Sequence, residues 1–443
     1  MGGDITYATI PSTTAGVPRY HVVVRQFTTP STPVIVNPLT LVATNGSCGG
    51  VATNITMPLT QTLNGAHQAC TSTAPFYLVS LYEADVDLPT GQWTLSNTTS
   101  AWTSGVQNIP GSTLQSLYIS AYLDNTTTVQ DTSPKFESVL EPIISVSASA
   151  PHSFSAFDAD GDSLRYEVVA PAGGCGQPLV STPAPHFVVN TATGALEPTA
   201  ATTSTQGYYS LSVRVSEYRK LSPNRWVLLG YVNRDLLYTV YATTNLPPTF
   251  TGLSVNGGAS RSPSLPILIQ PGQTTQVTLT ASDPDAGQLL RFTSGAPNVV
   301  PGLSLTTLGA TQVKLTWQVP AGLPPGRYAI PVAVLDNGCT TNASEDRTLL
   351  FIVGGSQPLA SRASSSAATD VYPVPFREQV QFTTAPNQAV VLVDALGREV
   401  ARLTSAADGR VRWLPASSLP AGLYLARSAA DGRALARLLR AGE

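Results

Sequence analysis

The acidic stretch Asp158-Ala-Asp-Gly-Asp-Ser-Leu-Arg-Tyr166 decides how this sequence is divided. A related turn, Ser282-Asp-Pro-Asp-Ala-Gly287, begins its acidic run at Asp283, which lies 125 residues after Asp158. Each turn is followed, later in the chain, by two long strand-like runs. An offset of this size equals one domain with its linker. The sequence therefore predicts two tandem copies of one strand-rich module.

Turn residues and short apolar runs extend this prediction to the whole chain. Its 443 residues include 35 Gly and 36 Pro, and only 12% are charged. Such a composition is typical of strands and turns, and the length predicts about three domains. No run approaches the roughly 20 apolar residues of a transmembrane helix, and a net charge of −3 gives no electrostatic footprint for nucleic acid. We expect an all-β chain of tandem β-sandwiches with no transmembrane segment and no nucleic-acid partner.

The predicted boundaries follow changes in composition. Asn245-Leu-Pro-Pro-Thr-Phe250 is a stiff connection, because consecutive prolines favour extended backbone, whereas Gly, Ser and Ala dominate a flexible linker further on. The last 73 residues carry nine arginines and six acidic residues, unlike the acidic remainder of the chain. The predicted units are three sandwiches, a linker and a small C-terminal sandwich: 1–137, 138–244, 245–355, 356–369 and 370–443.

Carboxylates at alternate positions of a turn suit a hard cation such as Ca²⁺, which binds oxygen ligands. The first turn is not an EF-hand, because Ser163 and Val169 stand where that motif needs Gly and Glu. The alternative is that Asp, Asn and Gly simply favour turns through local hydrogen bonds. Recurrence of the pattern favours a structural Ca²⁺ site, which would neutralise like charges and stiffen the joint between modules.

The topology of an immunoglobulin-type sandwich adds candidate ligands to both sites. In this topology the loop after the second strand lies at the same end of the sandwich as the loop after the sixth strand. The incoming linker also enters at that end. For the first site we expect Asp158, Asp160, Asp162, Glu217 and Glu141. For the second, weaker site we expect Asp283, Asp285, Asp336, Asn337 and Asn245.

The four cysteines are too few for a disulfide scaffold. Cys48 and Cys70 fall in one predicted domain, so we expect them to form a disulfide in an oxidising compartment. Cys175 and Cys339 lie in different predicted domains, and either isolated thiols or a contact across an interface would fit them. The N-terminus does not resemble a signal peptide, so we expect an intracellular chain or one shown without its leader.

The two acidic turns resemble the D-x-D-G-D-x-L-x-Y signature of cadherin-like and immunoglobulin-like repeats in bacterial surface proteins. The opening Gly2-Gly3-Asp4-Ile5-Thr6-Tyr7 and the run Gln115-Ser-Leu-Tyr-Ile119 also resemble large surface proteins that carry such repeats. This resemblance implies Ca²⁺ at the domain ends and a role in adhesion.

The C-terminal segment resembles a type A sorting domain of the type IX secretion system. The resemblance is carried, in order, by Val371-Tyr-Pro-Val-Pro-Phe376, Val393–Val400, Leu419–Arg427 and Arg437-Leu-Leu-Arg440, with Val374 where the family usually has Asn. It implies a small β-sandwich that an outer-membrane translocon reads and that is cleaved as the cargo reaches the bacterial surface. It also implies a signal peptide trimmed before Met1. The implied signal positions are Pro373, Pro375, Gly397, Gly422, Tyr424, Arg437 and Arg440.

We therefore expect a secreted, non-catalytic surface protein with an unknown protein or polysaccharide ligand. No G-x-S-x-G, H-E-x-x-H or phosphate-loop motif occurs. One alternative is a carbohydrate-binding module protein, which would need Trp93 and Trp102 to be exposed. Another is a hydrolase in residues 1–137, where Glu83, Asp85 and Asp87 share one strand face; a solvated strand end explains them more simply.

Overall fold

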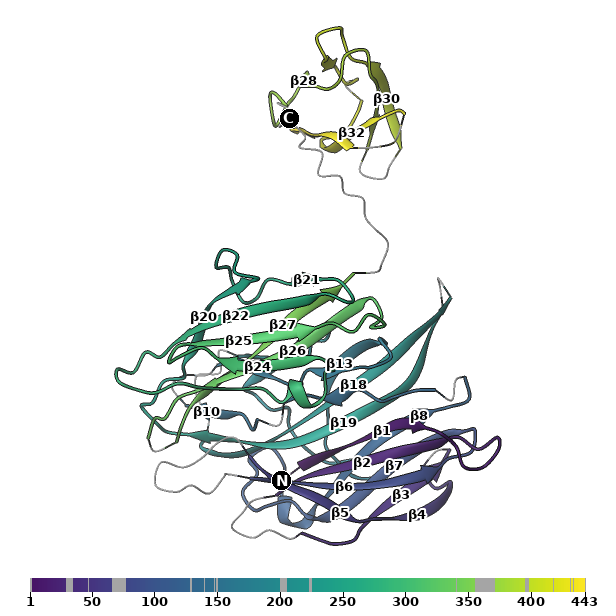
Figure 1. Ribbon diagram of the computed structural model, residues 1–443, viewed down its shortest axis with the longest axis vertical. Helices are drawn as coiled ribbons and strands as arrows, with labels where there is room; N and C mark the ends of the chain where they lie inside the picture. Colours follow the sequence, from purple (N-terminus) through teal and green to yellow (C-terminus); the bar gives the residue numbers. More distant parts are fainter. Residues whose placement is uncertain are drawn as a thin grey trace. The chain divides into compact units, whose positions relative to one another are not determined.

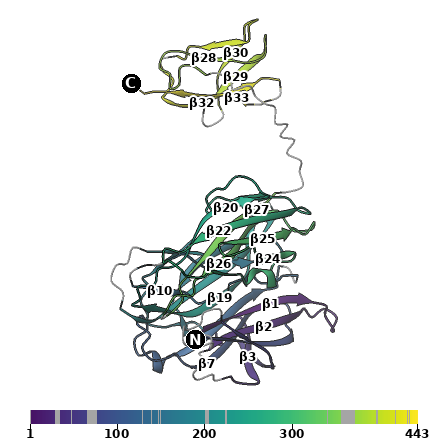
Figure 2. The same cartoon turned by 60° about the vertical axis from the view of Figure 1, so that its left-hand side comes forward.

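The computed structural model describes residues 2–442 except 29–34, 47, 66–76, 128–129, 139, 147, 149, 200–204, 223–224, 340, 355–370, 395–397, 417, 431 and 433. The chain divides into two compact units, Met1–Gln357 and Pro358–Glu443, drawn in Figures 1 and 2. Two single-turn 3-10 helices, Ser112–Leu114 and Ala296–Asn298, are the helices among the described residues. Neither helix is long and apolar enough to span a membrane. The all-β prediction is confirmed.

Residues 245–354 form an eight-stranded sandwich, which we call the third module. One sheet has the order β20-β22-β25-β24 and the other β21-β27-β26-β23. The short β21 runs parallel to β27. These sheets have the ABED and CFG pattern of the immunoglobulin topology. The strands are β20 (Thr249–Val255), β21 (Ile267–Ile269), β22 (Thr274–Ser282), β23 (Arg291–Thr293), β24 (Leu303–Thr307), β25 (Gln312–Gln318), β26 (Gly326–Leu335) and β27 (Ser344–Val353).

The preceding segment, the second module, repeats this plan. Its sheets run β11-β17-β16 and β10-β19-β18-β13, and β10 is again parallel to the last strand, β19. The prediction of tandem copies is confirmed. The strands are β9 (Lys135–Phe136), β10 (Ile143–Ser145), β11 (His152–Ser153), β12 (Ala156–Phe157), β13 (Ser163–Val169), β14 (Ala172–Gly174), β15 (Gln177–Pro178), β16 (Phe187–Val189), β17 (Ala195–Pro198), β18 (Gly207–Ser222) and β19 (Arg225–Tyr241).

The first strands of the two modules match in register. Phe136 of β9 pairs with Ala156, and Phe250 of β20 pairs with Ala281. Each alanine stands two residues before the first aspartate of its acidic turn. The second module therefore begins near residue 131, and the boundary expected between 137 and 138 is wrong. A two-residue strand gives no periodic pattern that sequence reasoning could detect.

The N-terminal segment does not have a core of its own, contrary to the prediction. Two four-stranded runs, β1-β2-β6-β5 and β8-β7-β3-β4, are both hydrogen-bonded to β19 of the second module, as Figure 1 shows for β1 beside β19. One hydrophobic cluster extends from Ile5 to Val240. The strands are β1 (Gly2–Ile10), β2 (Arg19–Thr28), β3 (Leu39–Asn45), β4 (Val51–Met57), β5 (Leu59–Asn64), β6 (Leu78–Asp87), β7 (Gln92–Ala101) and β8 (Ser116–Asp124).

A buried group of charges joins β19 to the N-terminal segment. The Asp4 carboxylate on β1 accepts hydrogen bonds from Arg25 Nε at 2.7 Å and from Arg234 Nε at 2.8 Å. Asp4 and Arg234 are 0% and 2% exposed. The Arg234 guanidinium also lies 4.3 Å from the ring centre of Phe136. Burial alone would raise the pKa of Asp4, but the two arginines outweigh it and hold that pKa below its ordinary value.

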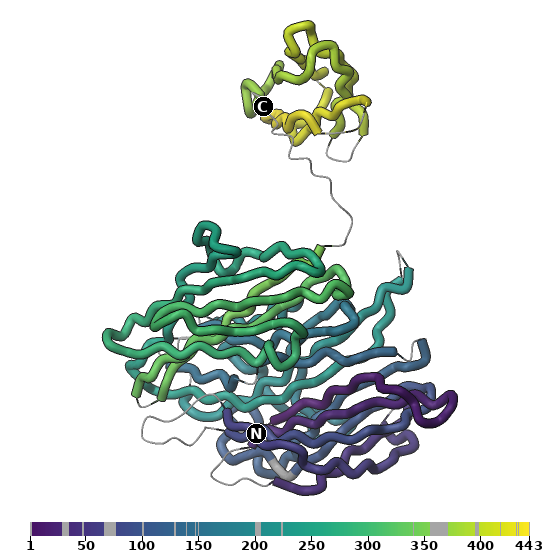
Figure 3. Tube along the Cα trace, viewed as in Figure 1, coloured from purple at the N-terminus to yellow at the C-terminus, as the bar shows by residue number. Residues whose placement is uncertain are grey.

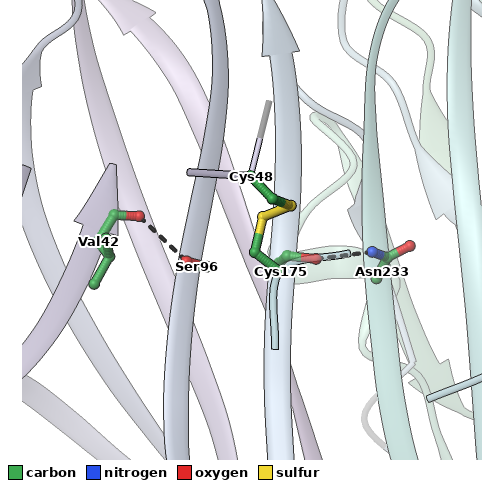
Figure 4. Close-up of a disulfide and its surroundings, with 6 residues drawn as sticks. Val42, Cys48, Ser96, Cys175 and Asn233 are labelled. Carbon is green, nitrogen blue, oxygen red and sulfur yellow. Dashed lines mark hydrogen bonds between the residues drawn. A yellow bond between two sulfur atoms is a disulfide. The ribbon is translucent and has the colours of Figure 1, made fainter. Parts of the chain in front are cut away.

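A disulfide between Cys48 and Cys175 forms a second link between these segments. It joins the β3–β4 turn to the β14–β15 turn, with Cα atoms 5.4 Å apart, and Figure 4 shows it beside the Ser96–Val42 hydrogen bond. The predicted pairing of Cys48 with Cys70 is therefore wrong for Cys48, and Cys70 lies outside the described residues. Cys339 is also disulfide-bonded, so the expectation of isolated thiols fails for Cys175 and Cys339.

The second and third modules pack side by side through polar contacts as well as through the linker. Ser138 Oγ donates to Asp346 Oδ2 at 2.7 Å, and Thr348 Oγ1 donates to Ser153 Oγ at 2.8 Å. The Phe157 ring contacts Tyr328 with centroids 5.6 Å apart. These contacts between β26–β27 and residues 138–157 make the joint broad, and they add to the stiff connection expected at residues 245–250.

The second compact unit is a small sandwich of a two-stranded sheet, β28-β31, and a four-stranded sheet, β30-β29-β32-β33. Figure 3 traces its chain in olive to yellow. Its core includes Phe376, Trp413 and Tyr424. The small C-terminal sandwich is confirmed, whereas the predicted linker 356–369 lies outside the described residues. The strands are β28 (Val380–Thr383), β29 (Ala389–Val393), β30 (Glu399–Thr404), β31 (Arg410–Trp413), β32 (Gly422–Ser428) and β33 (Ala434–Arg440).

Candidate metal centre

Five carboxylates gather where the N-terminal segment and both modules of the first unit meet. Three come from the β12–β13 loop, one from β18 and one from the chain leading into β9. Gly161 in this loop has a φ of 77°, and a Cβ there would lie 2.4 Å from Pro324 of the third module, so the close approach requires glycine. We call this group the acidic cluster: Asp131, Asp158, Asp160, Asp162 and Glu217.

The spacing of the oxygens fits a cation. One oxygen from each of Asp158, Asp160 and Asp162 lies within 4.8 Å of the others, and the same holds for Asp131, Asp162 and Glu217. Two oxygens bound to one Ca²⁺ at about 2.3 to 2.6 Å can be at most roughly 5 Å apart. The four predicted residues of the β12–β13 loop and β18 therefore do come together.

Glu217 occupies the innermost position of the acidic cluster and is fully buried. Its Oε1 accepts a hydrogen bond from the Tyr7 hydroxyl at 2.8 Å. Glu217 pairs across the sheet with Gly230 of β19, where a Cβ would lie 2.1 Å from Tyr7 Oη and 2.4 Å from Glu217 Oε1. Only glycine leaves room for these two side chains to meet.

Arg219 forms the cationic outer side of the acidic cluster and was not among the predicted site residues. Its Nη2 lies 2.7 Å from Asp162 Oδ2, 2.8 Å from Asp131 Oδ1 and 3.4 Å from Asp160 Oδ2. One guanidinium faces five carboxyl groups, so Arg219 alone cannot balance their charge when all five are ionised. Arg219 therefore competes with a metal ion for the outer oxygens and leaves the inner ones unpaired.

Three buried carboxylate oxygens of the acidic cluster have no hydrogen-bond partner in the part of the chain that the structure describes. They are Asp131 Oδ2, Asp158 Oδ2 and Glu217 Oε2. A buried anionic oxygen without a partner is costly. The inner side of the cluster is therefore suited to hold a cation bound only through oxygen, which is the ligand chemistry of Ca²⁺.

The electrostatics of the cluster agree with this interpretation. Burial, partly offset by Arg219, raises the pKa of Asp131 to about 7. Burial also raises the pKa of Asp158 to about 7, with added repulsion from Asp162 and Asp160. The pKa of Glu217 lies well above its ordinary value, through burial and then through Asp131 and Asp158. Without a further cation, these groups hold protons at pH values where carboxyls are normally ionised.

The second predicted site also assembles, and hydrogen bonds pair most of its polar atoms, although Asp283 Oδ2 and Gln288 Oε1 are buried without a partner among the described residues. Asn245 Nδ2 donates to Asp336 Oδ2 at 3.0 Å, and the Leu246 amide donates to Asp285 Oδ2 at 2.8 Å. Asp283 Oδ1 accepts from the Asp285 amide. Hydrogen bonds thus stabilise most of the oxygens of this second site, whereas the inner oxygens of the first site would need a cation. This cluster fits the alternative in which Asp and Asn stabilise turns locally.

Two predicted ligands make other contacts. Glu141 is not in the acidic cluster: its carboxylate accepts from Thr239 on β19, and burial raises its pKa to about 7. Asn337 uses its side-chain oxygen to accept from the Leu289 amide at 2.8 Å, which closes a loop. Glu141 was predicted because the second module was taken to begin at residue 138.

Asp131 takes the place expected for Glu141, and a sequence signal for it exists. The stretch Asp131-Thr-Ser-Pro-Lys-Phe136 has Pro and Phe three and five residues after its first position, as does Asn245-Leu-Pro-Pro-Thr-Phe250. The two stretches lead into β9 and β20. Asp131 and Asn245 are therefore equivalent residues of the two modules.

The proposed sorting residues lie in the second unit, except that Gly397 is outside the described residues. Tyr424 is buried, and its hydroxyl donates to the Pro420 carbonyl at 2.6 Å. Arg440 donates to the Leu419 carbonyl, and Arg437 is exposed on β33. Pro373 is half-buried, Pro375 exposed, and Gly422 has a φ of 152°.

The features behind the two alternative functions have structural explanations. Trp93 and Trp102 are 7% and 2% exposed, so neither offers a surface for a sugar. Asp85 and Asp87 make cross-strand ion pairs with Arg19, and Glu83 and Asp85 contact the His21 ring. These contacts fit a solvated strand, the simpler explanation of the three carboxylates.

No family model and no curated protein matches the chain. Solved structures similar to it include Drosophila N-cadherin EC1-4, with 13% identity over 68% of this chain and 74% of that chain, and a TM-score of 0.20. Human desmocollin-1 ectodomain has 12% identity over 94% of this chain and 76% of that chain, with a TM-score of 0.19. At such TM-scores the structures do not superpose as wholes, and we infer nothing about function from them.

Proposed function

We propose that the chain is a non-catalytic, extracellular adhesion or ligand-binding protein whose acidic cluster binds Ca²⁺. The proposal is carried by the three buried, unpartnered oxygens of Asp131, Asp158 and Glu217. The Cys48–Cys175 disulfide supports an oxidising compartment. The small second unit, together with its motif order, supports export as a type IX secretion cargo that ends in a sorting domain.

In this proposal the metal acts on the structure and not in a reaction. Asp131 belongs to the entry of the second module. The β12–β13 loop, which carries three of the aspartates, approaches the third module at Gly161, and Glu217 contacts Tyr7 of β1. A cation held by these side chains would tie the three segments together. Because unfolding would separate the ligands, binding would stabilise the fold.

Calcium is expected to bind the full, EDTA-treated chain and to raise the Tm of the first unit. At a free concentration 100 times the Kd, the stabilisation would be about 2.7 kcal/mol. The isosteric variants Asp158→Asn and Glu217→Gln each remove one ligand charge, and we expect each to weaken binding about tenfold or more. Isothermal titration calorimetry and differential scanning calorimetry measure both effects.

Asp87→Asn is the matched control, because Asp87 is an exposed carboxylate 3.9 Å from Arg19 and far in sequence from the cluster. It should leave calcium affinity unchanged. Undiminished affinity in both cluster variants, or no heat of binding in the wild-type chain, would refute the calcium assignment.

The calcium effect is expected to grow with pH. Asp131 and Asp158 have folded-state pKa values of about 7, raised above the ordinary 3.8. Between about pH 4 and 7 the folded chain thus holds protons that the unfolded chain has released, so stability without calcium falls as pH rises. Calcium must displace these protons, and its affinity should rise up to about tenfold per pH unit for each proton displaced.

The measurement compares Tm with excess calcium and with EDTA at about pH 5.5 and about pH 8. Other buried acids with raised pKa values, such as Asp235 and Asp346, affect both conditions equally and cancel in the difference. A calcium-induced shift that is the same at both pH values would contradict protonation of the acidic cluster.

A further inference from the structure

A cleft of about 750 Å³ lies beside the acidic cluster, between the second and third modules. Its walls come from the β12–β13 loop and β13, from the far end of the β18–β19 hairpin, and from residues 325–327 before and within β26. None of the predicted functions used this cleft. Three features of its lining point to one class of ligand.

The first feature is an exposed tryptophan. Trp226 on β19 lines the cleft and is 53% exposed, whereas the other four tryptophans are at most 7% exposed. The Lys220 ammonium lies 5.7 Å from its ring centre. A large aromatic ring left in water loses the stabilisation that burial gives to the others. A flat, open indole in a cleft is suited to stack on the face of a ligand ring.

The second feature is a set of cations without acidic partners. Arg165, Lys220 and Arg327 line the cleft and are exposed, and no ion pair involves them among the described residues. Arg165 and Lys220 belong to the second module and Arg327 to the third, so positive charge stands on both walls. Only 15 Lys and Arg occur in residues 1–370, so three of them without acidic partners in one cleft favour an anionic group on the ligand.

The third feature is the set of hydrogen-bond acceptors in the same cleft. Asp160 and Asp162 line it next to Arg219, and the Asp160 side chain is 35% exposed. Carboxylates can accept hydrogen bonds from hydroxyl groups. A ligand that matches all three features has flat ring faces, several hydroxyls and negative charges at intervals.

We infer that this cleft binds an acidic polysaccharide. A sugar ring would stack on Trp226, its hydroxyls would donate to Asp160, and carboxylate or sulfate groups would contact Arg165, Lys220 and Arg327. The inference rests on the proposed ligand-binding role but does not require calcium. An acidic peptide shares the charge but lacks the ring face and the hydroxyls, so the cleft favours the saccharide.

The test measures binding of defined probes to the full chain by isothermal titration calorimetry, with calcium and with EDTA. Oligogalacturonate carries carboxylates, chondroitin sulfate oligosaccharides carry sulfates, a neutral dextran oligosaccharide carries neither, and oligoglutamate is an acidic peptide. We expect at least one of the two anionic saccharides to bind, and the neutral one to bind at least about tenfold more weakly. The stronger of the two identifies the acidic group.

Two variants locate the site. Trp226→Ala should weaken binding about tenfold or more, with partial retention in Trp226→Phe, because stacking needs a ring. Arg327→Gln should weaken binding of the anionic saccharide and reduce its salt dependence. Tyr372→Ala and Arg410→Gln are matched controls, because both side chains are exposed in the second unit, and neither should change affinity.

Unchanged affinity in Trp226→Ala, or binding of oligoglutamate as tight as that of both saccharides, would overturn the inference. So would the absence of binding by either anionic saccharide with and without calcium. A chain that binds calcium but neither saccharide would refute this inference alone. A chain that binds a saccharide equally in EDTA, without any calcium binding, would refute only the calcium proposal.

Discussion

The variant Asp4→Asn is expected to lower the free energy of unfolding of the first unit by about 3 to 5 kcal/mol. Asp4 is the carboxylate shared by Arg25 and Arg234. In the variant, Arg234 keeps its hydrogen bond to the Ser138 carbonyl but remains a buried cation without a counter-charge. Removal of one partner from a buried ion pair costs far more than the pair itself contributes, because desolvation of the remaining charge is uncompensated.

Urea denaturation of the full chain measures the loss in free energy of unfolding. Hydrogen exchange of peptides from β1 and β19 then shows whether this loss arises at these two strands. Asp85→Asn is the control, since Asp85 is 42% exposed and also pairs with an arginine of β2. Exposed pairs contribute about 0 to 1 kcal/mol, so this variant should have little effect. A loss below about 1 kcal/mol for Asp4→Asn would show that β1 is not anchored to β19 by this charge.

The repeats and the first acidic turn could be predicted from sequence because their signals are local. The alternation of Asp158, Asp160 and Asp162 within one turn predicts that their oxygens converge, and the immunoglobulin topology then brings Glu217 to the same pole. Both expectations hold in the structure.

The sharing of β19 could not be predicted in the same way. This strand has 17 residues, so it is longer than a strand of a single sandwich needs to be. Its additional length pairs with β1 and β8 of the N-terminal segment. Such pairing joins residues more than 100 positions apart, and hydrophobic alternation does not specify the partner. The same reason explains Arg219, whose role depends on which strands meet, whereas the motif shared with Asn245–Phe250 could have identified Asp131.

Cysteine pairing illustrates this limit most directly. Sequence proximity favoured Cys48 with Cys70, because both lie in what was taken to be one domain. The structure pairs Cys48 with Cys175 across a separation of 127 residues. The partner is decided by β14, which pairs with β8 and places its turn next to the β3–β4 turn.

The double variant Cys48→Ala/Cys175→Ala is expected to lower the free energy of unfolding of the first unit by about 3 to 5 kcal/mol. The disulfide closes a loop of 127 residues, and in the chain-entropy model a longer loop restricts the unfolded state more. Substitution of both cysteines avoids a free thiol. It also leaves the disulfide of Cys339 intact, which a reducing agent would not.

Urea denaturation of the full chain, followed by hydrogen exchange of β3, β4 and β14 peptides, compares the variant with the wild type. Ser96→Ala is a control in the same region: its hydroxyl makes a long hydrogen bond, 3.4 Å, to the Val42 carbonyl, and its loss should cost about 1 kcal/mol or less. Mass-spectrometric mapping of the unreduced wild-type chain should recover Cys48 linked to Cys175. If Cys48 is recovered with another partner, or the double variant is as stable as the wild type, the link between the β3–β4 and β14–β15 turns is not what holds these segments together.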